Sequence, residues 1–201
     1  MPWNRDVGAF DARADTYDQG WQATMHREIV RKAVDLAVCV HPDPVDVLDV
    51  GCGTGFLLRE LATRSSGRPR LSGIDAAPRM IATASAQAAD AGLDISYELG
   101  SVERLPFDDG RFDLVVSTTS FDHWEDQQKG LTECSRVLHP GGHLVCVDQF
   151  SNLMWPTLLT SRRGKARTKR RAERILRSAG FGRVTWHEIY ALIIKGFVAY
   201  G

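Results

Sequence analysis

Val47-Leu48-Asp49-Val50-Gly51-Cys52-Gly53-Thr54-Gly55 joins an apolar strand pattern to an acid and then to three glycines at alternate positions. Glycine lacks a Cβ, so the chain at Gly51, Gly53 and Gly55 can take positive φ and let a ligand approach the main chain. Residues 56–61 continue as a helical pattern, whose first N–H groups have no intrahelical partner and face the loop. The stretch predicts a strand, a nucleotide-type cofactor loop and a helix.

Two common phosphate-binding loops do not fit this stretch. The dinucleotide fingerprint Gly-x-Gly-x-x-Gly needs glycine at position 56, where the chain has Phe56. No Gly-Lys-Ser/Thr follows, which excludes a P-loop. A tight strand-to-helix turn without any ligand would also explain the glycines, so the neighbouring residues must decide.

Length and composition predict one globular domain over residues 1–201. The 201 residues are enough for a proper core, and 43% of them are apolar. The chain has no apolar run of the roughly 18 residues that a membrane span needs. Residues 1–6 lack the basic-then-apolar pattern of a signal peptide. The default expectation is therefore a cytoplasmic protein.

The cysteines and histidines do not suggest a metal or disulfide site. The four cysteines, at 39, 52, 134 and 146, form no Cys-x-x-Cys pair, so we expect buried free thiols. Cys52 lies in the glycine loop, but no basic residue nearby in the sequence would activate it as a nucleophile. The six histidines show no metal-ligand spacing, and we expect no metal.

Residues 162–177 are strongly basic. They contain nine Arg or Lys residues and one acid, which leaves the remainder of the chain net negative. Such a segment can bind nucleic acid, or it can be a solvated loop and the exposed face of a helix. No aromatic residues are interleaved to stack on bases, so we favour the solvated interpretation over a nucleic-acid partner.

Hydrophobic periodicity predicts alternating helices and short strands. The expected helices are 26–38, 55–65, 78–91, 127–138 and 169–179, and the expected strands are 46–50, 70–75, 95–99, 112–118, 143–149 and two within 182–200. Strands separated by helices imply right-handed crossovers and a mostly parallel sheet. The last two strands are close enough to form a hairpin. We therefore expect an α/β, Rossmann-like fold with a seven-stranded, mostly parallel sheet, one antiparallel strand near the C-terminus and helices on both faces.

Two acids stand where such a sheet binds its ligand, at the carboxyl ends of the strands. Asp75 ends the second expected strand, where a carboxylate can accept both hydroxyls of a ribose. Alternatively, Asp75 caps the helix that begins near Pro78. Asp49 precedes the first glycine of the loop, where its charge disfavours a pyrophosphate and favours a positively charged ligand.

S-adenosylmethionine (SAM) is such a ligand, because it joins a nucleoside to a sulfonium and has no phosphate. The chain resembles the class I SAM-dependent methyltransferases, in particular the small-molecule branch that includes ubiquinone- and menaquinone-biosynthesis enzymes. The matching motifs are VLDVGCGTG (47–55), GIDAAPRMIATA (73–84), ELGSVERLPFDDGRFDLVVSTTSFDHW (98–124) and RVLHPGGHLVCVD (136–148). The resemblance implies SAM as cofactor and S-adenosylhomocysteine (SAH) as its product.

The resemblance also implies which residues contact the cofactor. The methionine part would lie on Asp49, Gly51, Gly53 and Gly55, the ribose on Asp75, and the adenine beside Ala76, Met80, Ser101 and Val102, with backbone contacts from Ser117 and Thr118. Members of the family usually hold the adenine amino group with an aspartate, and Ser101 takes that position here without its charge.

Tyr17 falls where family members lay a tyrosine over the cofactor, and its π face could attract the sulfonium. The alternative is that Tyr17 and Trp21, four residues apart, form one apolar stripe of a helix.

The resemblance places His123, just past the fourth expected strand, where relatives often carry histidine. Methyl transfer is an in-line displacement, and a base is needed only when the acceptor must lose a proton. An imidazole has an ordinary pKa of about 6.5, which suits that task, so His123 is the candidate base. Packing or orienting the acceptor is the alternative role. Trp124 and Trp155 would either wall an apolar acceptor pocket or pack in the core.

The segments outside the motifs are short: an N-terminal lid segment, 1–25, and a substrate-side insert, 151–168. Such coverings suit a small-molecule acceptor, methylated on O, N or C. The rival interpretations are an RNA or protein methyltransferase that uses residues 162–177, a nicotinamide-dependent oxidoreductase, and a non-catalytic SAM-binding protein. The sequence does not indicate an oligomeric state.

Overall fold

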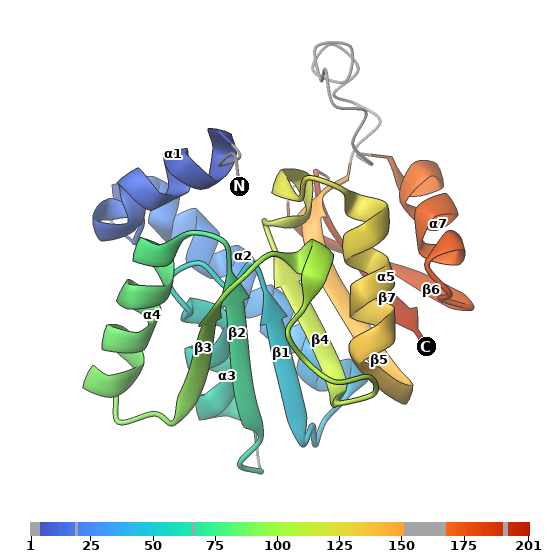
Figure 1. Cartoon of the computed structure of the whole chain (residues 1–201), viewed down its shortest axis with the longest axis horizontal. Helices are drawn as coiled ribbons and strands as arrows, with labels where there is room; N and C mark the ends of the chain where they lie inside the picture. Colours follow the sequence, from blue (N-terminus) through green and yellow to red (C-terminus); the bar gives the residue numbers. More distant parts are fainter. Residues whose placement is uncertain (1–4, 19, 66, 151–167, 191–192) are drawn as a thin grey trace.

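The structure is a computed structural model that describes residues 5–18, 20–65, 67–150, 168–190 and 193–201 (Figure 1). The predicted insert 151–168, with Trp155 and the first part of the basic segment, therefore lies almost wholly outside the described residues.

Seven strands form one sheet in the order β3-β2-β1-β4-β5-β7-β6. Strands β1 to β5 pair in parallel, and β7 runs antiparallel to both β5 and β6. The predicted sheet, with one antiparallel strand near the C-terminus, is confirmed. The strands are β1 (Asp46–Val50), β2 (Arg70–Asp75), β3 (Ile95–Leu99), β4 (Phe112–Thr118), β5 (Leu138–Gln149), β6 (Arg183–Tyr190) and β7 (Ile194–Tyr200).

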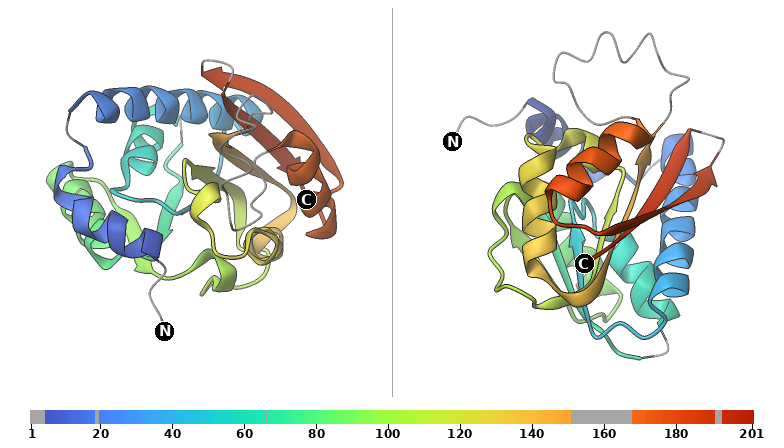
Figure 2. Two further views of the ribbon diagram at one scale, coloured as in Figure 1. Left: turned by 90° about the horizontal axis from the view of Figure 1, so that it is seen from above. Right: turned by 90° about the vertical axis from the view of Figure 1, so that its right-hand side faces the viewer.

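Helices cover both faces of the sheet (Figures 1 and 2). Helices α2 and α3 pack on one face, and α5 and α7 pack on the other. None of the described helices is long and apolar enough to cross a bilayer. The helices are α1 (Arg5–Arg13), α2 (Gly20–Val40), α3 (Phe56–Arg64), α4 (Pro78–Asp90), α5 (Gln127–Val137) and α7 (Lys169–Ser178), with 3₁₀ turns η1 (Ala14–Thr16), η2 (Val102–Arg104) and η3 (Phe121–His123).

Helix α1 was not predicted, and α2 begins ahead of its predicted start at residue 26. The sequence of α1 contains Gly8, which weakens a helix in isolation. Tertiary packing decides its conformation, because Val7 and Phe10 join Ala14 in an apolar cluster with Met80 of α4. Helix α1 thus lies across the top of the sheet near α4 (Figure 1).

Strand β1 alternates its side chains between the two faces. Leu48 and Val50 pack in the layer that contains α5, whereas Val47 packs with α2 and α3. The same alternation puts Asp49 on the α2 side, at the end of β1. The carboxylate of Asp49 therefore lies between the ends of the strands and α2.

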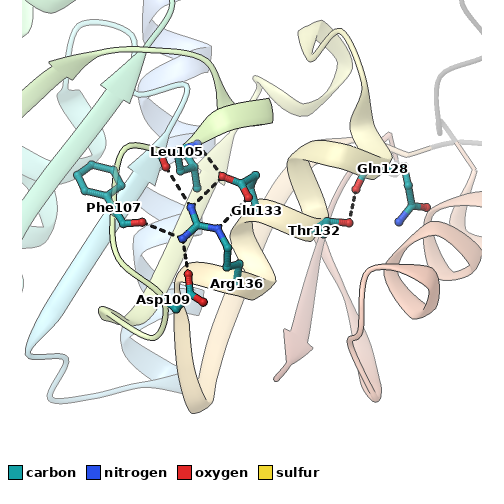
Figure 3. Close-up of polar contacts among 7 residues, drawn as sticks. All are labelled: Leu105, Phe107, Asp109, Gln128, Thr132, Glu133 and Arg136. Atoms are coloured by element: carbon teal, nitrogen blue, oxygen red, sulfur yellow. Dashed lines mark hydrogen bonds and ion pairs between the residues drawn. The ribbon is translucent and has the colours of Figure 1, made fainter.

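The connection from β3 to β4 contains only the short turn η2. Arg136 of α5 holds this connection in place (Figure 3). Its guanidinium donates to the carbonyl oxygens of Leu105 at 3.0 Å and Phe107 at 2.8 Å, and to the carboxylates of Asp109 at 2.7 Å and Glu133 at 2.8 Å. The hydrogen bond from Arg136 holds the pKa of Glu133 below its ordinary value. A planar guanidinium with five N–H donors fits these acceptors, and an ammonium does not.

We expect Arg136→Lys to lower the free energy of unfolding by about 1.5–3 kcal/mol, because charge-assisted hydrogen bonds to the connection are lost. Urea denaturation measures the change. Arg104→Lys, at an exposed position of η2, is the matched control and should change stability by less than about 0.5 kcal/mol. Equal stabilities of Arg136→Lys and the wild type would contradict this role.

Candidate functional site

A cavity of about 500 Å³ opens at the carboxyl ends of β1, β2, β3 and β4. Phe10 of α1 and Tyr17, just after η1, form part of its wall. The volume lies in the usual range for small-molecule sites, and the location is the one expected for an open α/β sheet.

Most of the residues predicted from the sequence line this cavity. They are Tyr17, Asp49, Gly51, Gly53, Asp75, Ala76, Met80, Ser101, Val102, Thr118 and His123. They come from the segment after η1, from the ends of β3, β2, β1 and β4 with the loops and turns that follow them, and from α4. The fold thus brings together residues that are far apart in the sequence.

Two predicted residues do not line the cavity. Gly55 has φ of +76° and precedes α3, where an added Cβ would lie 2.2 Å from Tyr97 Oη. The Ser117 hydroxyl is buried and donates a 2.9 Å hydrogen bond to the carbonyl oxygen of Val50. Gly55 lets the loop turn against β3, and Ser117 ties β4 to β1, so both shape the floor of the site.

The glycine loop is tied to β2 and leaves open space above it. The N–H groups of Gly51 and Cys52 donate to the carbonyl oxygen of Ile74 at 2.8 and 3.0 Å. A Cβ on Gly51, which has φ of +71°, would lie 1.8 Å from Ser120 Oγ. A Cβ on Gly53, which has φ of +53°, would meet no atom within 4 Å. The space over Gly53 is therefore free for a ligand.

Asp75 joins the glycine loop to the start of α4. Its Oδ2 accepts the N–H of Gly53 and its Oδ1 accepts the N–H of Ala77, both at 2.9 Å. The cap residue of α4 is Ala77, so Asp75 stands outside the cap position that the alternative gave it. The backbone of Ala76 is a third donor, and a carboxylate has about four lone-pair sites, so Asp75 can still accept from a ligand. Burial raises the pKa of Asp75, and the hydrogen bonds from Ala77 and Gly53 oppose that rise.

Asp49 is a buried acid with an unusual proton affinity. Only 2% of its surface is exposed. Burial, and next the nearby charge of Asp75, raise the pKa of Asp49 to about 8. A positively charged ligand group would favour its ionised form. This position is thus suited to a cation.

The cysteines follow the prediction with one correction. Cys52, Cys134 and Cys146 are buried and free, but Cys39 is exposed near the end of α2, so the expectation that all four thiols are buried was wrong. Burial raises the pKa of the Cys52 thiol well above its ordinary value, which keeps it protonated in the loop.

Tyr17 belongs to the cavity wall and not to an apolar stripe with Trp21. It precedes α2, and its ring contacts Phe10 and His26 edge-on, with centroid distances of 6.3 and 5.4 Å. Trp21 is 74% exposed. The alternative role for this pair was therefore wrong.

His123 and Trp124 follow β4 through η3. The His123 ring packs edge-on against Phe10, with centroids 4.8 Å apart, and the residue is exposed. Trp124 is buried, contacts Phe121 at a centroid distance of 4.9 Å and also lines the cavity. Trp124 thus packs in the core and also lines the cavity, and its contact with an acceptor stays a prediction.

Sequence reasoning missed part of the cavity wall. Phe10, His26 and Thr119 line it, and the His26 Nε2 atom lies 3.0 Å from Thr119 Oγ1. The position of Thr119 just past β4 was a usable signal. No sequence signal identified His26, because it is the first residue of an expected helix that lies far from any motif.

The fold and site define a Rossmann-like domain for a nucleoside-containing cofactor. Residues 48–146 match a family described as "Methyltransferase domain". The chain is 40% identical to a demethylmenaquinone methyltransferase of Thermus thermophilus, over 59% of this chain and 52% of that protein. It therefore spans about half the length of the curated relatives that it matches.

Solved structures agree in fold. A SAM-dependent methyltransferase from Aquifex aeolicus matches with a TM-score of 0.72 and 21% identity, covering 94% of this chain and 97% of that one. The [4+2]-cyclase SpnF matches with a TM-score of 0.69 and 26% identity, covering 80% and 60%. The chain belongs to the class I SAM-dependent methyltransferases. The predicted family and its cofactor, SAM, are thus confirmed.

We expect Asp49→Asn to stabilise the cofactor-free protein by about 0.5–2 kcal/mol at pH 8. The folded pKa is raised above the ordinary value, so the stability that protonation contributes is complete below about pH 4 and is lost as the pH rises through about 8. Asparagine does not ionise, so its advantage should grow between pH 5 and pH 8. Urea denaturation at both pH values measures it. Asp94→Asn, at an exposed position, is the control and should show no such trend.

Proposed function

We propose that the protein transfers the methyl group of SAM to a small molecule held in the same cavity. The observation that carries this proposal is the meeting of the glycine loop, Asp49 and Asp75 in one cavity of about 500 Å³. The fold by itself does not fix the reaction, since one neighbour of this fold is named as a cyclase.

The residues present fit the cofactor. Asp49 would pair with the amino group of the methionine part, which compensates its burial. The open space over Gly53 would receive the same part of the cofactor. Asp75 would accept the ribose hydroxyls with its remaining lone pairs. Ala76, Met80, Ser101 and Val102 would surround the adenine, and Tyr17 would cover the cofactor from the N-terminal side.

Bound SAM supplies a methyl group on a sulfonium, which a nucleophile displaces in line. The chain's contribution would be to bind, to align and to exclude water. Phe10 and Tyr17 cover the cavity, and Trp124 gives it an aromatic wall. His123 would stand beside the acceptor, either as the base or as an orienting group. We propose that the N-terminal segment 1–25 acts as the lid, within a single domain.

The cavity suits a small acceptor better than RNA or a folded protein. It lies under α1, and Phe10, Tyr17 and Trp124 give it aromatic walls. The basic helix α7 packs against α5, toward the opposite edge of the sheet from α1 (Figure 1). Residues of α7 do not line the cavity. An acceptor that bound to α7 would thus lie away from the cofactor.

Calorimetry tests the cofactor site. We expect SAM and SAH to bind with micromolar affinity, and Asp75→Ala to weaken both about 10- to 100-fold, because charge-assisted hydrogen bonds worth about 1.5–3 kcal/mol are lost. Asp94→Ala, at an exposed position, should bind like the wild type. A preference for NAD over SAM, or no binding of SAM, would refute the proposed function.

His123→Ala should leave SAM affinity unchanged and lower turnover with an acceptor, measured as SAH formation. A loss of about 100-fold or more would identify His123 as the base, and a smaller loss would identify an orienting group. Unchanged turnover would remove His123 from the reaction altogether.

A further inference from the structure

A second histidine faces the cavity from α2. His26 Nε2 lies 3.0 Å from Thr119 Oγ1, and its ring packs edge-on against Tyr17. The Thr119 side chain also lies near the Tyr17 phenol, where it opposes the rise in the pKa of Tyr17 that burial causes. All three side chains line the cavity, yet they come from the segment after η1, from α2 and from the tip of β4. They form one polar cluster in the wall of the cavity.

The backbone of Thr119 is strained. Its φ is +51°, the only positive φ of a non-glycine residue in the part of the chain that the structure describes. A β-branched residue rarely adopts this conformation, and strain of this kind gathers at functional sites. The N–H of Thr119 donates to the carbonyl oxygen of Val147 at 2.8 Å, which helps to hold the backbone there. The strained conformation places the hydroxyl against His26.

The neighbouring residue carries an unsatisfied hydroxyl. Thr118 is only 9% exposed and lines the cavity, and its Oγ1 is buried without a hydrogen-bond partner among the described residues. Buried polar atoms almost always have partners, so this hydroxyl is an exception beside the strained Thr119.

The cluster carries no charge near neutral pH. Burial lowers the pKa of His26, and the cation Arg27 lowers it further, while Asp18 opposes both. Burial raises the pKa of Tyr17, so its phenol keeps its proton. The acids that line the cavity lie outside this cluster: Asp49 and Asp75 on β1 and β2, Glu103 in η2 and Glu125 just after η3. An uncharged donor and acceptor set suits a neutral hydroxyl better than an ammonium or a carboxylate.

The cluster also lies at the end of the cavity where a methyl acceptor must enter. The residues assigned to adenine and ribose lie at β3 and β2, and those assigned to the methionine part lie at β1. Thr119 follows β4, the next strand in that order, and His26 reaches it from α2. This step rests on the proposed function.

We propose that Thr119 and His26 hold the hydroxyl of an O-methyl acceptor, an alcohol or a phenol, and that His26 receives its proton. Thr119 Oγ1 lies 2.8 Å from Thr118 O and 3.0 Å from His26 Nε2, so its own proton has both acceptors in reach. His123 is then an orienting group.

The step balances. A lone pair of the acceptor oxygen forms the bond to the methyl carbon, and the electrons of the broken C–S bond remain on sulfur as a neutral thioether. The acceptor's proton passes to Thr119 Oγ1 while the Thr119 proton passes to His26 Nε2, which ends the step as an imidazolium.

Binding of two matched probes tests the hydroxyl site. We titrate 4-fluorophenol and fluorobenzene into the SAH complex and follow ¹⁹F NMR. The wild type should bind the phenol at least 10-fold more tightly, because its hydroxyl pairs with the cluster. His26→Phe and Thr119→Ala should lose that preference. Thr119→Ser, which keeps the hydroxyl, and His139→Gln, exposed at the start of β5, should retain it.

Turnover tests the proton transfer. With SAM and 4-fluorophenol, His26→Phe should lower kcat about 100-fold or more and leave the SAM dissociation constant unchanged. The wild-type kcat should rise with pH through a pKa below 6.5 and then stay level, and His26→Phe should lose that rise. The groups that face His26 are Asp18, Arg27 and Tyr17. None of them is changed in these variants, so a change in the pH profile reports on His26 itself. A rise that persists in His26→Phe but vanishes in His123→Gln would assign the base to His123 and overturn the proposal.

Three further outcomes would overturn it: equal affinity for the two probes, no methyl transfer to bound 4-fluorophenol by the wild type, or unchanged kcat in His26→Phe. If His26→Phe does not fold, the contrast between Thr119→Ala and Thr119→Ser decides. Failure of the proposed function would differ, because the wild type would then not bind SAM or SAH in calorimetry.

Discussion

The hydrogen bonds of the Asp75 carboxylate organise the whole site. One oxygen accepts the N–H of Gly53 and the other accepts the N–H of Ala77, so the loop after β1 and the start of α4 depend on the same side chain. The loop after β1 could take many conformations because of its glycines, and this bond restricts it. The shape of the cavity depends on the same bonds, because the cavity lies between the glycine loop and the start of α4. A ligand that binds Asp75 therefore meets a loop already in place.

The two acids of the site, Asp49 and Asp75, are unfavourable for stability when the site is empty. The charge of Asp75 disfavours ionisation of Asp49, and burial raises the pKa of both acids. Alone, such an arrangement weakens the fold. A cation bound between strand tips and α2 would reverse the sign of that contribution, so the same two acids cost stability in the empty protein and contribute affinity in the complex. Function, and not folding, explains their place.

Much of the fold could be predicted because it rests on local patterns, and part of the cavity wall followed from the resemblance of the motifs to a known family. Alternating apolar strands, helical periodicity and strand-end acids gave the sheet, its one antiparallel strand and the positions of Asp49 and Asp75. Helix α1 could not be predicted, since Gly8 weakens it locally and only packing on Met80 selects it. His26 was missed for a similar reason: its partner Thr119 is 93 residues away in the sequence, and no local pattern joins them. Cys39 shows the converse, a residue assigned to the core by type that the helix turns toward solvent.

Helix α1 has a consequence for the kinetics of the protein. A nine-residue helix is not stable alone in water, and here it depends on its contacts with α4 and on the rings of Tyr17 and His123 that Phe10 touches. The free energy needed to detach it is thus a small part of that needed to unfold the sheet. Molecules could enter and leave the cavity by local melting of α1 while the seven strands stay intact. The residence time of a bound molecule would then be set by the helix–coil equilibrium of these nine residues.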